Sequence, residues 1–350
     1  MILIDNFKKE KILKPTSLLI AVYFVILTFS FSLQANENIL TRAELAVKAE
    51  NYEQAHRLFN QLANNNDLKT EALFGLARVA FMTEHLDDAE EYISDVLELS
   101  PDNPEYLFIA GRISGKQAQS ASIFSKLGYA SDAKQYFSQA LLINKSHQPS
   151  LIGLIKFHQQ APVIAGGDKD EIPNLFDRLR AIDRSAAFSI EAPILLNENK
   201  IDKVINLYND ALIDETDKNR FRFDFAMMLS NHGLYKTALQ ELILIDINNV
   251  SKTADFLTMR LYQIGKLAAE STSQLALGLM SMTQYSLMPK VDKTISKDWV
   301  DFRLAQLMFL SNDNSVNQQT LIKMMKKTSD NVLKNKIKTF LHDNKQQRTS

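Results

Sequence analysis

A small residue followed four positions later by a bulky one recurs along this chain, and no other feature of the sequence constrains the fold as much. The pairs are Ala55 with Phe59, Ala89 with Ile93, Ala133 with Phe137, Val204 with Tyr208, and Ala238 with Leu242. The first two pairs lie 34 residues apart, and so do the last two. Self-similarity at a fixed period of this size is typical of chains built from stacked copies of one supersecondary unit.

Composition indicates that each unit is helical. The 350 residues include only 10 Gly and 8 Pro, whereas Leu, Ala, Lys, Glu and Gln recur throughout, which favours helices joined by short turns. A further apolar helix is expected before each pair, for example with Leu73, Leu76, Ala77 and Ala80 before Ala89. We therefore expect an all-α chain of antiparallel helix pairs, in which small residues let the backbones approach and bulky residues pack onto the next unit.

Over roughly residues 36–249 this pattern resembles the tetratricopeptide repeat family, and Pro101 closes the second unit where that family has its proline. The resemblance implies a right-handed superhelical solenoid of about six helix pairs, with a concave groove made mainly by the first helix of each pair. After Asn249 the register loosens. Residues 250–350 are expected to form degenerate helical repeats and a helical C-terminal cap, which includes the Lys-rich stretch Leu321–Leu341.

Two insertions interrupt the period. Ten extra residues around the string KQAQSASIFSKLG are expected to lengthen a first helix or its turn, and five extra residues lie near QQAPVIAGGD. Both strings resemble ones in exported bacterial members of the family. Insertions in repeat proteins usually map to loops on one edge, and such loops often bind ligands or partners.

Residues 1–35 have the order of an export signal. Four lysines precede an uncharged apolar run from Leu18 to Leu33, and Gln34 and Ala35 follow it. Cleavage after Ala35 gives a periplasmic protein. The alternative is an uncleaved inner-membrane anchor facing the periplasm, and Leu33, which is bulky for a position three residues before the cut, favours this alternative. Without residues 1–35 the 40 basic and 41 acidic residues become 36 and 39, a net charge of −3 that gives no indication of nucleic acid binding.

Aligning the first helices of three successive units produces two rows of equivalent residues. The apolar row is Phe74, Phe108 and Ile152, and the basic row four positions later is Arg78, Arg112 and Lys156. In the resemblance both rows fall on the concave face, where cations can hold a carboxylate or an acidic extended segment while the apolar side chains hold its neighbours. The alternative is that these residues are ordinary packing and solvated charges.

No catalytic or metal-binding motif is apparent in the sequence. The chain has no Cys, and its six His residues show no i, i+4 pair and no HExxH motif, so we expect no metal and no cofactor. Gly166 and Gly167 lack the Lys-Ser/Thr pair of a phosphate loop, and Asp168 with Glu171 three residues later predicts a helix-start box instead. The serines lack a GxSxG elbow. The chain is therefore expected not to be an enzyme.

We expect a non-catalytic scaffold or adaptor that binds a peptide or helix of a partner protein, one that is acidic or presents a carboxylate. Self-association is an alternative, because nine acids and no Lys or Arg lie from Glu84 to Glu105 whereas eight basic residues and two acids lie from Lys323 to Ser350. An enzyme or small-ligand protein is a third hypothesis. It predicts a closed polar pocket near the insertions at Gln117–Gly128 and Ala161–Asp168.

Overall fold

The computed structural model describes residues 36–64, 67–249, 256–288, 295–313 and 315–346, and over these ranges every regular element is a helix. The all-α prediction is confirmed. The chain divides into two compact units, residues 1–183 (unit 1) and 184–350 (unit 2). The expected export signal lies outside the described residues. Among the described helices, none is long and apolar enough to cross a bilayer.

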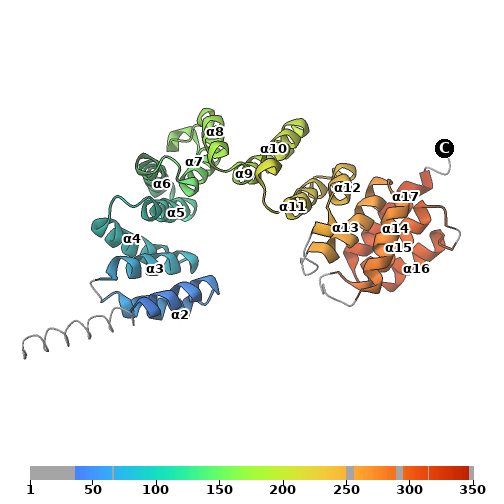
Figure 1. Cartoon of the computed structure of the whole chain (residues 1–350), viewed down its shortest axis with the longest axis horizontal. Coiled ribbons are helices and arrows are strands. Elements are labelled where there is room, and N and C mark those ends of the chain that lie inside the picture. Colours follow the sequence, from blue (N-terminus) through green and yellow to red (C-terminus); the bar gives the residue numbers. More distant parts are fainter. Residues whose placement is uncertain (1–35, 65–66, 250–255, 289–294, 314, 347–350) are drawn as a thin grey trace, which may run out of the picture. The chain divides into compact units, whose positions relative to one another are not determined.

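Unit 1 is a stack of helix pairs. Residues 36–48 are helical, and the labelled elements that follow are α2 (Tyr52–Leu62), α3 (Lys69–Met82), α4 (Leu86–Leu99), α5 (Pro104–Ser120), α6 (Ile123–Ile143), α7 (Gln148–Gln160), the 3-10 turns η1 (Val163–Ala165) and η2 (Lys169–Glu171), and α8 (Ile172–Ile182). From α2 on, each α-helix contacts the next, and α5 also contacts α3 and α7 (Figure 1). The first helices of neighbouring pairs therefore lie side by side.

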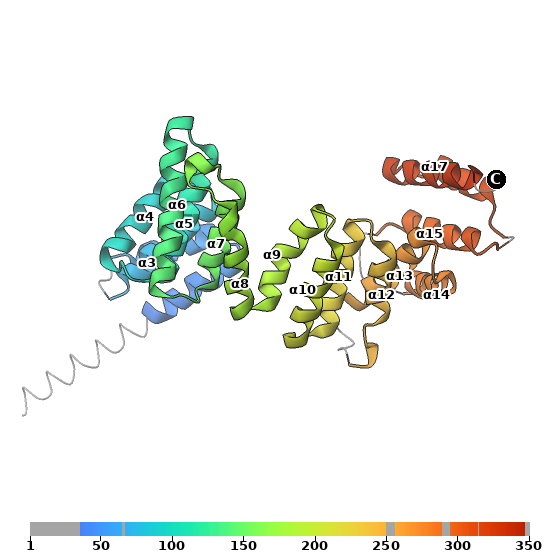
Figure 2. The same cartoon turned by 90° about the horizontal axis from the view of Figure 1, so that it is seen from above.

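Unit 2 repeats this arrangement and ends in an additional helix. Its elements are α9 (Arg184–Asn197), α10 (Ile201–Asp214), α11 (Lys218–Asn231), α12 (Tyr235–Ile243), η3 (Ile247–Asn249), α13 (Phe256–Ser271), α14 (Leu275–Leu287), α15 (Lys297–Leu310), α16 (Gln318–Lys327) and α17 (Asn331–Gln346). Successive helices again contact one another, and α13 also contacts α11 and α15 (Figure 2). The boundary expected after Asn249 lies inside this unit.

The same tight turn joins the helices of most pairs. A residue with positive φ follows the first helix, at 57° for Glu50, 63° for Glu84, 57° for Asn199 and 76° for Gly233. The next N–H then reaches back to a carbonyl five residues earlier, as in His85 to Ala80 at 2.9 Å. This bond satisfies a carbonyl that the helix end leaves unpaired, in the manner of a Schellman turn.

The two pairs with insertions end their first helices differently, with extended residues at Ala121 and Ala161. The first insertion lengthens both helices of its pair, so that α5 has 17 residues and α6 has 21, compared with 14 each in α3 and α4. The second insertion forms the connection that contains η1 and η2. The predicted turn lengthening thus also involves the second helix of the pair.

The small and bulky residues that revealed the repeat are all buried. They are Ala55, Phe59, Ala89, Ile93, Ala133, Phe137, Val204, Tyr208, Ala238 and Leu242. Phe137 of α6 shows why small partners are needed: a Cβ added to Gly111 of α5 or to Gly153 of α7 would lie 2.6 Å or 2.8 Å from its ring. One phenylalanine thus packs against two successive first helices, and this contact couples neighbouring pairs.

The Lys-rich stretch Leu321–Leu341 forms two helices, α16 and α17, that meet near Thr328. Their apolar side chains Leu321, Leu333, Ile337 and Phe340 join a buried cluster with Phe302 and Phe309 of α15. Other charged side chains of the two helices, such as Lys338, are exposed. A terminal helix with one polar side lets a stack of repeats end in water.

Candidate partner-binding site

The six predicted site residues lie on the first helices of three consecutive pairs in unit 1. They are Phe74 and Arg78 on α3, Phe108 and Arg112 on α5, and Ile152 and Lys156 on α7. The apolar three are partly buried, Arg78 is also partly buried, and Arg112 and Lys156 are exposed. Because α5 contacts both α3 and α7, the three pairs of residues belong to one set of neighbouring helices.

Arg78 is already paired within the chain. Its Nη1 donates to both carboxylate oxygens of Glu44, at 2.9 and 3.0 Å, and its guanidinium lies 5.5 Å from the ring centre of Phe74. Glu44 lies 34 residues before Arg78, at the equivalent position of the first unit. Its charge therefore compensates the first cation of the basic row, so Arg78 is less available to an external carboxylate than the sequence suggested.

Arg112 has a different environment. Its guanidinium lies 4.6 Å from the ring centre of Phe81 and 5.7 Å from that of Phe108, and no ion pair is found for it within the described ranges. Partial burial lowers its pKa, while the charge of Glu105 opposes this shift. A guanidinium remains protonated at physiological pH under such shifts. Arg112 is thus a fixed, exposed cation held against two aromatic rings.

Lys156 completes the row on α7 as an exposed side chain, and the described parts of the chain give it no ion pair. Ile152, one turn before it, is partly buried. Two of the three predicted cations, Arg112 and Lys156, therefore make no ion pair in the described residues. They lie on adjacent helices, α5 and α7.

Aromatic contacts that the sequence alignment did not single out extend the apolar row. The rings of Phe74 and Tyr106 are 4.6 Å apart, and the ring of Phe108 lies 6.0 Å from that of His147. Burial and the nearby carboxylate of Glu71 raise the pKa of Tyr106, so its hydroxyl stays protonated. Together these side chains form a partly apolar surface beside the cations.

His147 adds polar contacts at the base of α7. Its Nδ1 lies 2.8 Å from the Ser150 hydroxyl, and its Nε2 lies 3.4 Å from Oε2 of Glu105. Tyr106, Phe81 and His147 could have been found by extending the alignment from two positions per first helix to the whole helix and the turn before it.

The second insertion forms a loop that two hydrogen bonds hold in place. Lys134 Nζ donates to the Gly166 carbonyl at 2.9 Å, and the Asp168 N–H donates to Nδ1 of buried His158 at 2.9 Å. Asp168 also caps η2 by accepting from the N–H of Asp170 at 3.0 Å, so it begins a 3-10 turn. Within the described residues, no group of three or more His, Cys, Asp or Glu could hold a metal ion.

Comparison with known proteins supports the repeat interpretation. Residues 40–104 match the family model described as tetratricopeptide repeat, which covers the first two helix pairs. A comparison with curated protein sequences gives no match. The tetratricopeptide repeat is a protein-interaction fold whose stacked units create extended binding surfaces, so the class of partner is a protein or peptide.

Three solved structures illustrate the similarity. One is a thermophilic tetratricopeptide repeat protein of Thermus thermophilus, with 18% identity over 56% of this chain and 99% of that chain and a TM-score of 0.45. A tetratricopeptide repeat protein from Parabacteroides merdae ATCC 43184 has 14% identity over 79% and 99%, with a TM-score of 0.41. PilW, a type IV pilus biogenesis factor, has 11% identity over 74% and 96%, with a TM-score of 0.38.

These identities and TM-scores assign no function to this chain. The sequence match at residues 40–104 coincides with helix pairs that share a 34-residue period and the same Schellman-type turn at Glu50 and Glu84. On this evidence residues 40–104 are tetratricopeptide repeats, and the helix pairs that follow them are similar in form.

Proposed function

We propose that the chain is a non-catalytic scaffold of the bacterial envelope, and that unit 1 binds an extended, acidic segment of a partner protein along α3, α5 and α7. The binding surface consists of Phe74, Arg78, Phe108, Arg112, Ile152 and Lys156. The observation that carries the proposal is Arg112, an exposed guanidinium held against Phe81 and Phe108 without an ion pair in the described residues.

Arg112 is suited to a carboxylate because its guanidinium lies close to two aromatic rings and the side chain is still exposed. A carboxylate accepts two parallel hydrogen bonds from a guanidinium edge. Contact with two rings also restricts the guanidinium before a ligand arrives, which reduces the side-chain entropy lost on binding. A carboxylate side chain or a C-terminal carboxylate of the partner meets this requirement.

The second exposed cation sets the spacing of the acidic groups. Packed helices lie about 8–10 Å apart, and an extended chain advances about 3.3 Å per residue. A segment that runs across α5 and α7 therefore brings residues about three positions apart to Arg112 and Lys156. The intervening apolar side chains of the ligand would contact Phe108 and Ile152, which are partly buried.

The envelope location rests on the sequence of residues 1–35, in which four lysines precede the apolar run Leu18–Leu33. This arrangement predicts that the helical units lie on the periplasmic side, either free or tethered to the inner membrane. A C-terminal alkaline phosphatase fusion should be active in cells, because this enzyme requires the oxidising periplasm to form its disulfides. An inactive fusion would contradict the location and leave the binding proposal untouched.

Fluorescence anisotropy with a labelled peptide of alternating Asp and Leu residues tests the binding surface, and a peptide of alternating Lys and Leu serves as the opposite-charge probe. The Asp-Leu peptide is expected to bind more tightly. The double variant Arg112→Gln with Lys156→Gln should weaken its binding by at least about tenfold, since a charge-assisted hydrogen bond contributes about 1.5–3 kcal/mol. Lys203→Gln, an exposed lysine on α10 of unit 2, is the matched control and should leave the dissociation constant unchanged.

Equal affinity for the two peptides, or the same dissociation constant in the double variant as in the parent chain, would remove this surface from consideration. Circular dichroism of each variant establishes that the helices are intact. Because both substituted cations are exposed and make no ion pair in the described chain, the variants are expected to fold normally.

A further inference from the structure

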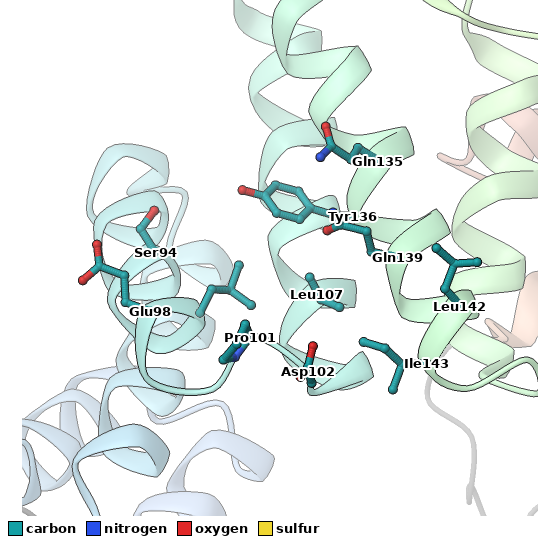
Figure 3. Close-up of a pocket in the computed structure, with 11 residues that line it drawn as sticks. Ser94, Glu98, Pro101, Asp102, Leu107, Gln135, Tyr136, Gln139, Leu142 and Ile143 are labelled. Carbon is teal, nitrogen blue, oxygen red and sulfur yellow. The ribbon is translucent and has the colours of Figure 1, made fainter.

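An open hollow lies in unit 1 and shares only α5 with the proposed binding surface. It has a volume of about 640 Å³ and lies between α4, α5 and α6 (Figure 3). Its lining includes Leu97 of α4, Leu107 of α5, and Tyr136, Leu142 and Ile143 of α6. Volumes of this size hold several aliphatic side chains.

Part of the apolar lining is unusually exposed. Leu142 is 80% exposed and Ile143 is 45% exposed, whereas Leu107, which also lines the hollow, is buried. Figure 3 shows Leu142 and Ile143 near the end of α6, across the hollow from Glu98 of α4. Binding of a partner over these two large aliphatic side chains is energetically favourable, because it removes apolar surface area from water.

The rim of the hollow is acidic. Glu98 and Asp102 line it, both are exposed, and the described residues give neither of them an ion pair. Two further exposed acids, Glu91 and Asp95, lie on α4 together with Glu98. No Lys or Arg occurs from Glu84 to Glu105. An occupant that carries cations at its edges is therefore favoured, whereas an acidic one is repelled.

We infer that this hollow is a second docking site and that its occupant is a cationic amphipathic helix of a partner protein. Leu-type side chains of the helix fill the space above Leu107 and against Leu142, and flanking Lys or Arg side chains reach Glu98 and Asp102. The lining from Gln135 to Ile143 of α6 spans about 12 Å at 1.5 Å per residue. This length matches two to three turns of a helix with apolar anchors at i, i+3/i+4 and i+7.

This site goes beyond the proposed peptide surface, since it uses the second helices α4 and α6 and selects the opposite charge. The chain would thus hold two different segments, one acidic and extended and the other basic and helical. Loss of either activity leaves the other measurable. Failure of this inference is therefore distinguishable from failure of the proposed function.

The test is fluorescence anisotropy of the full chain with a labelled 18-residue probe, a helix-forming peptide that has Leu on one face and Lys on the other. The Lys peptide is expected to bind at least about tenfold more tightly than a peptide in which Glu replaces every Lys. The double variant Glu98→Gln with Asp102→Asn should remove most of this preference. Leu142→Ser, on a side chain too exposed to support the fold, should weaken binding of the Lys peptide severalfold.

A matched control is Asp87→Asn with Asp88→Asn, which removes the same charge from exposed positions of α4 outside the lining. It should change the dissociation constant less than about twofold. Equal effects of the two double variants, or no effect of Leu142→Ser, would show a diffuse charge attraction and overturn the site. Sedimentation equilibrium that reveals a dimer dissociated by Leu142→Ser would assign the hollow to a second copy of the chain and would also overturn it.

Discussion

Arg112 in unit 1 and Arg303 in unit 2 both lie over aromatic rings, but only one of them has a carboxylate partner. The guanidinium of Arg303 lies 5.6 Å from the ring centre of Trp299 and 5.4 Å from that of Phe302, much as Arg112 lies over its two phenylalanines. Arg303 is 3% exposed, and its Nη1 is 2.7 Å from Oε1 of Glu270. Arg112 is exposed, and the nearby Glu105 makes no ion pair with it in the described chain.

Unit 2 extends the buried contact into a network. Lys336 of α17 lies 2.8 Å from the same oxygen of Glu270 on α13, and Arg303 of α15 also donates to Gln306 at 2.6 Å. Three helices are thus joined by one carboxylate. The comparison indicates two roles for an arginine that lies on aromatic rings. Where the chain itself supplies a carboxylate, the arginine stabilises the fold. Where the chain supplies none, the arginine is available to bind a partner.

The largest expected effect comes from removing the shared carboxylate of unit 2. Glu270→Gln leaves Arg303 and Lys336 without their counter-charge, and breaking a buried ion pair in this way typically costs about 3–5 kcal/mol. The fluorescence of Trp299, the single tryptophan of the chain, reports unfolding of unit 2 in urea. Arg112→Gln should cost less than about 1 kcal/mol by circular dichroism, since that cation is exposed.

Replacing the whole network sharpens this test. Arg303→Met, Glu270→Leu and Lys336→Met together should restore stability to near that of the parent chain, because apolar side chains of similar volume avoid the desolvation of buried charge. A triple variant as unstable as Glu270→Gln alone would contradict the assignment of the loss to unpaired charge.

Acid should have the same effect as Glu270→Gln. Burial tends to raise the pKa of Glu270, but Arg303 and Lys336 outweigh it and lower the pKa below 4.5. The stabilisation is therefore complete above the pKa of the unfolded chain, near 4.5, and is lost as the pH falls through the lower pKa of the folded state. The parent chain should lose Trp299-detected stability in this window, and the triple variant should lose less, because Asp330, which accepts from Trp299, remains in both.

Unit 1 is expected to depend on close packing instead of buried charge. Gly111→Ala places a methyl group against the ring of Phe137 and should destabilise unit 1 by about 1–3 kcal/mol. Gly128→Ala, in α6 with open space around it, should stabilise the same unit by about 0.5–1 kcal/mol through helix propensity. Thermal unfolding followed by circular dichroism measures the melting temperature, which should fall in Gly111→Ala and rise in Gly128→Ala. Equal changes in melting temperature in the two variants would contradict the packing contact.

A smaller pH effect is expected from His158, which is the buried imidazole of unit 1. Burial, with a further contribution from Lys134, lowers its pKa below 6.5, while Asp168 and Glu171 oppose the shift. Its neutral Nδ1 accepts from the Asp168 N–H, so the stabilisation is present above about pH 6.5 and is lost as the pH falls through the lower folded-state pKa. The protection factor of the Asp168 amide should fall as the pH is lowered through this range, and a constant protection factor would exclude the effect.

The helix pairs could be predicted from sequence because small and bulky residues that recur at a fixed period indicate repeated close packing of two helices. Ala89 and Phe137 are buried where two helices approach closely, and no other arrangement explains their spacing as simply. The end of α5 at an extended Ala121 and the lengthening of α6 could not be predicted, since insertions change the turn without changing the apolar pattern.

The candidate site was only partly predictable. The 34-residue period places Glu44 at the position equivalent to Arg78 in the first unit. Glu44 was missed because the alignment of first helices began with the second unit, at Phe74. The period also links the buried network, because Glu270 and Arg303 are 33 residues apart. The hollow beside Leu142 depends on how three helices pack together, and no local pattern in the sequence reports that packing.

Glu44→Gln tests most directly whether an internal carboxylate decides the role of an arginine. This change releases Arg78 on the same row as Arg112 and Lys156, so the Asp-Leu peptide should bind about three- to tenfold more tightly. Glu53→Gln, which removes an exposed acid paired with Arg57 on α2, is the matched control and should leave binding unchanged. A dissociation constant that stays the same or rises in Glu44→Gln would contradict the role given to this surface.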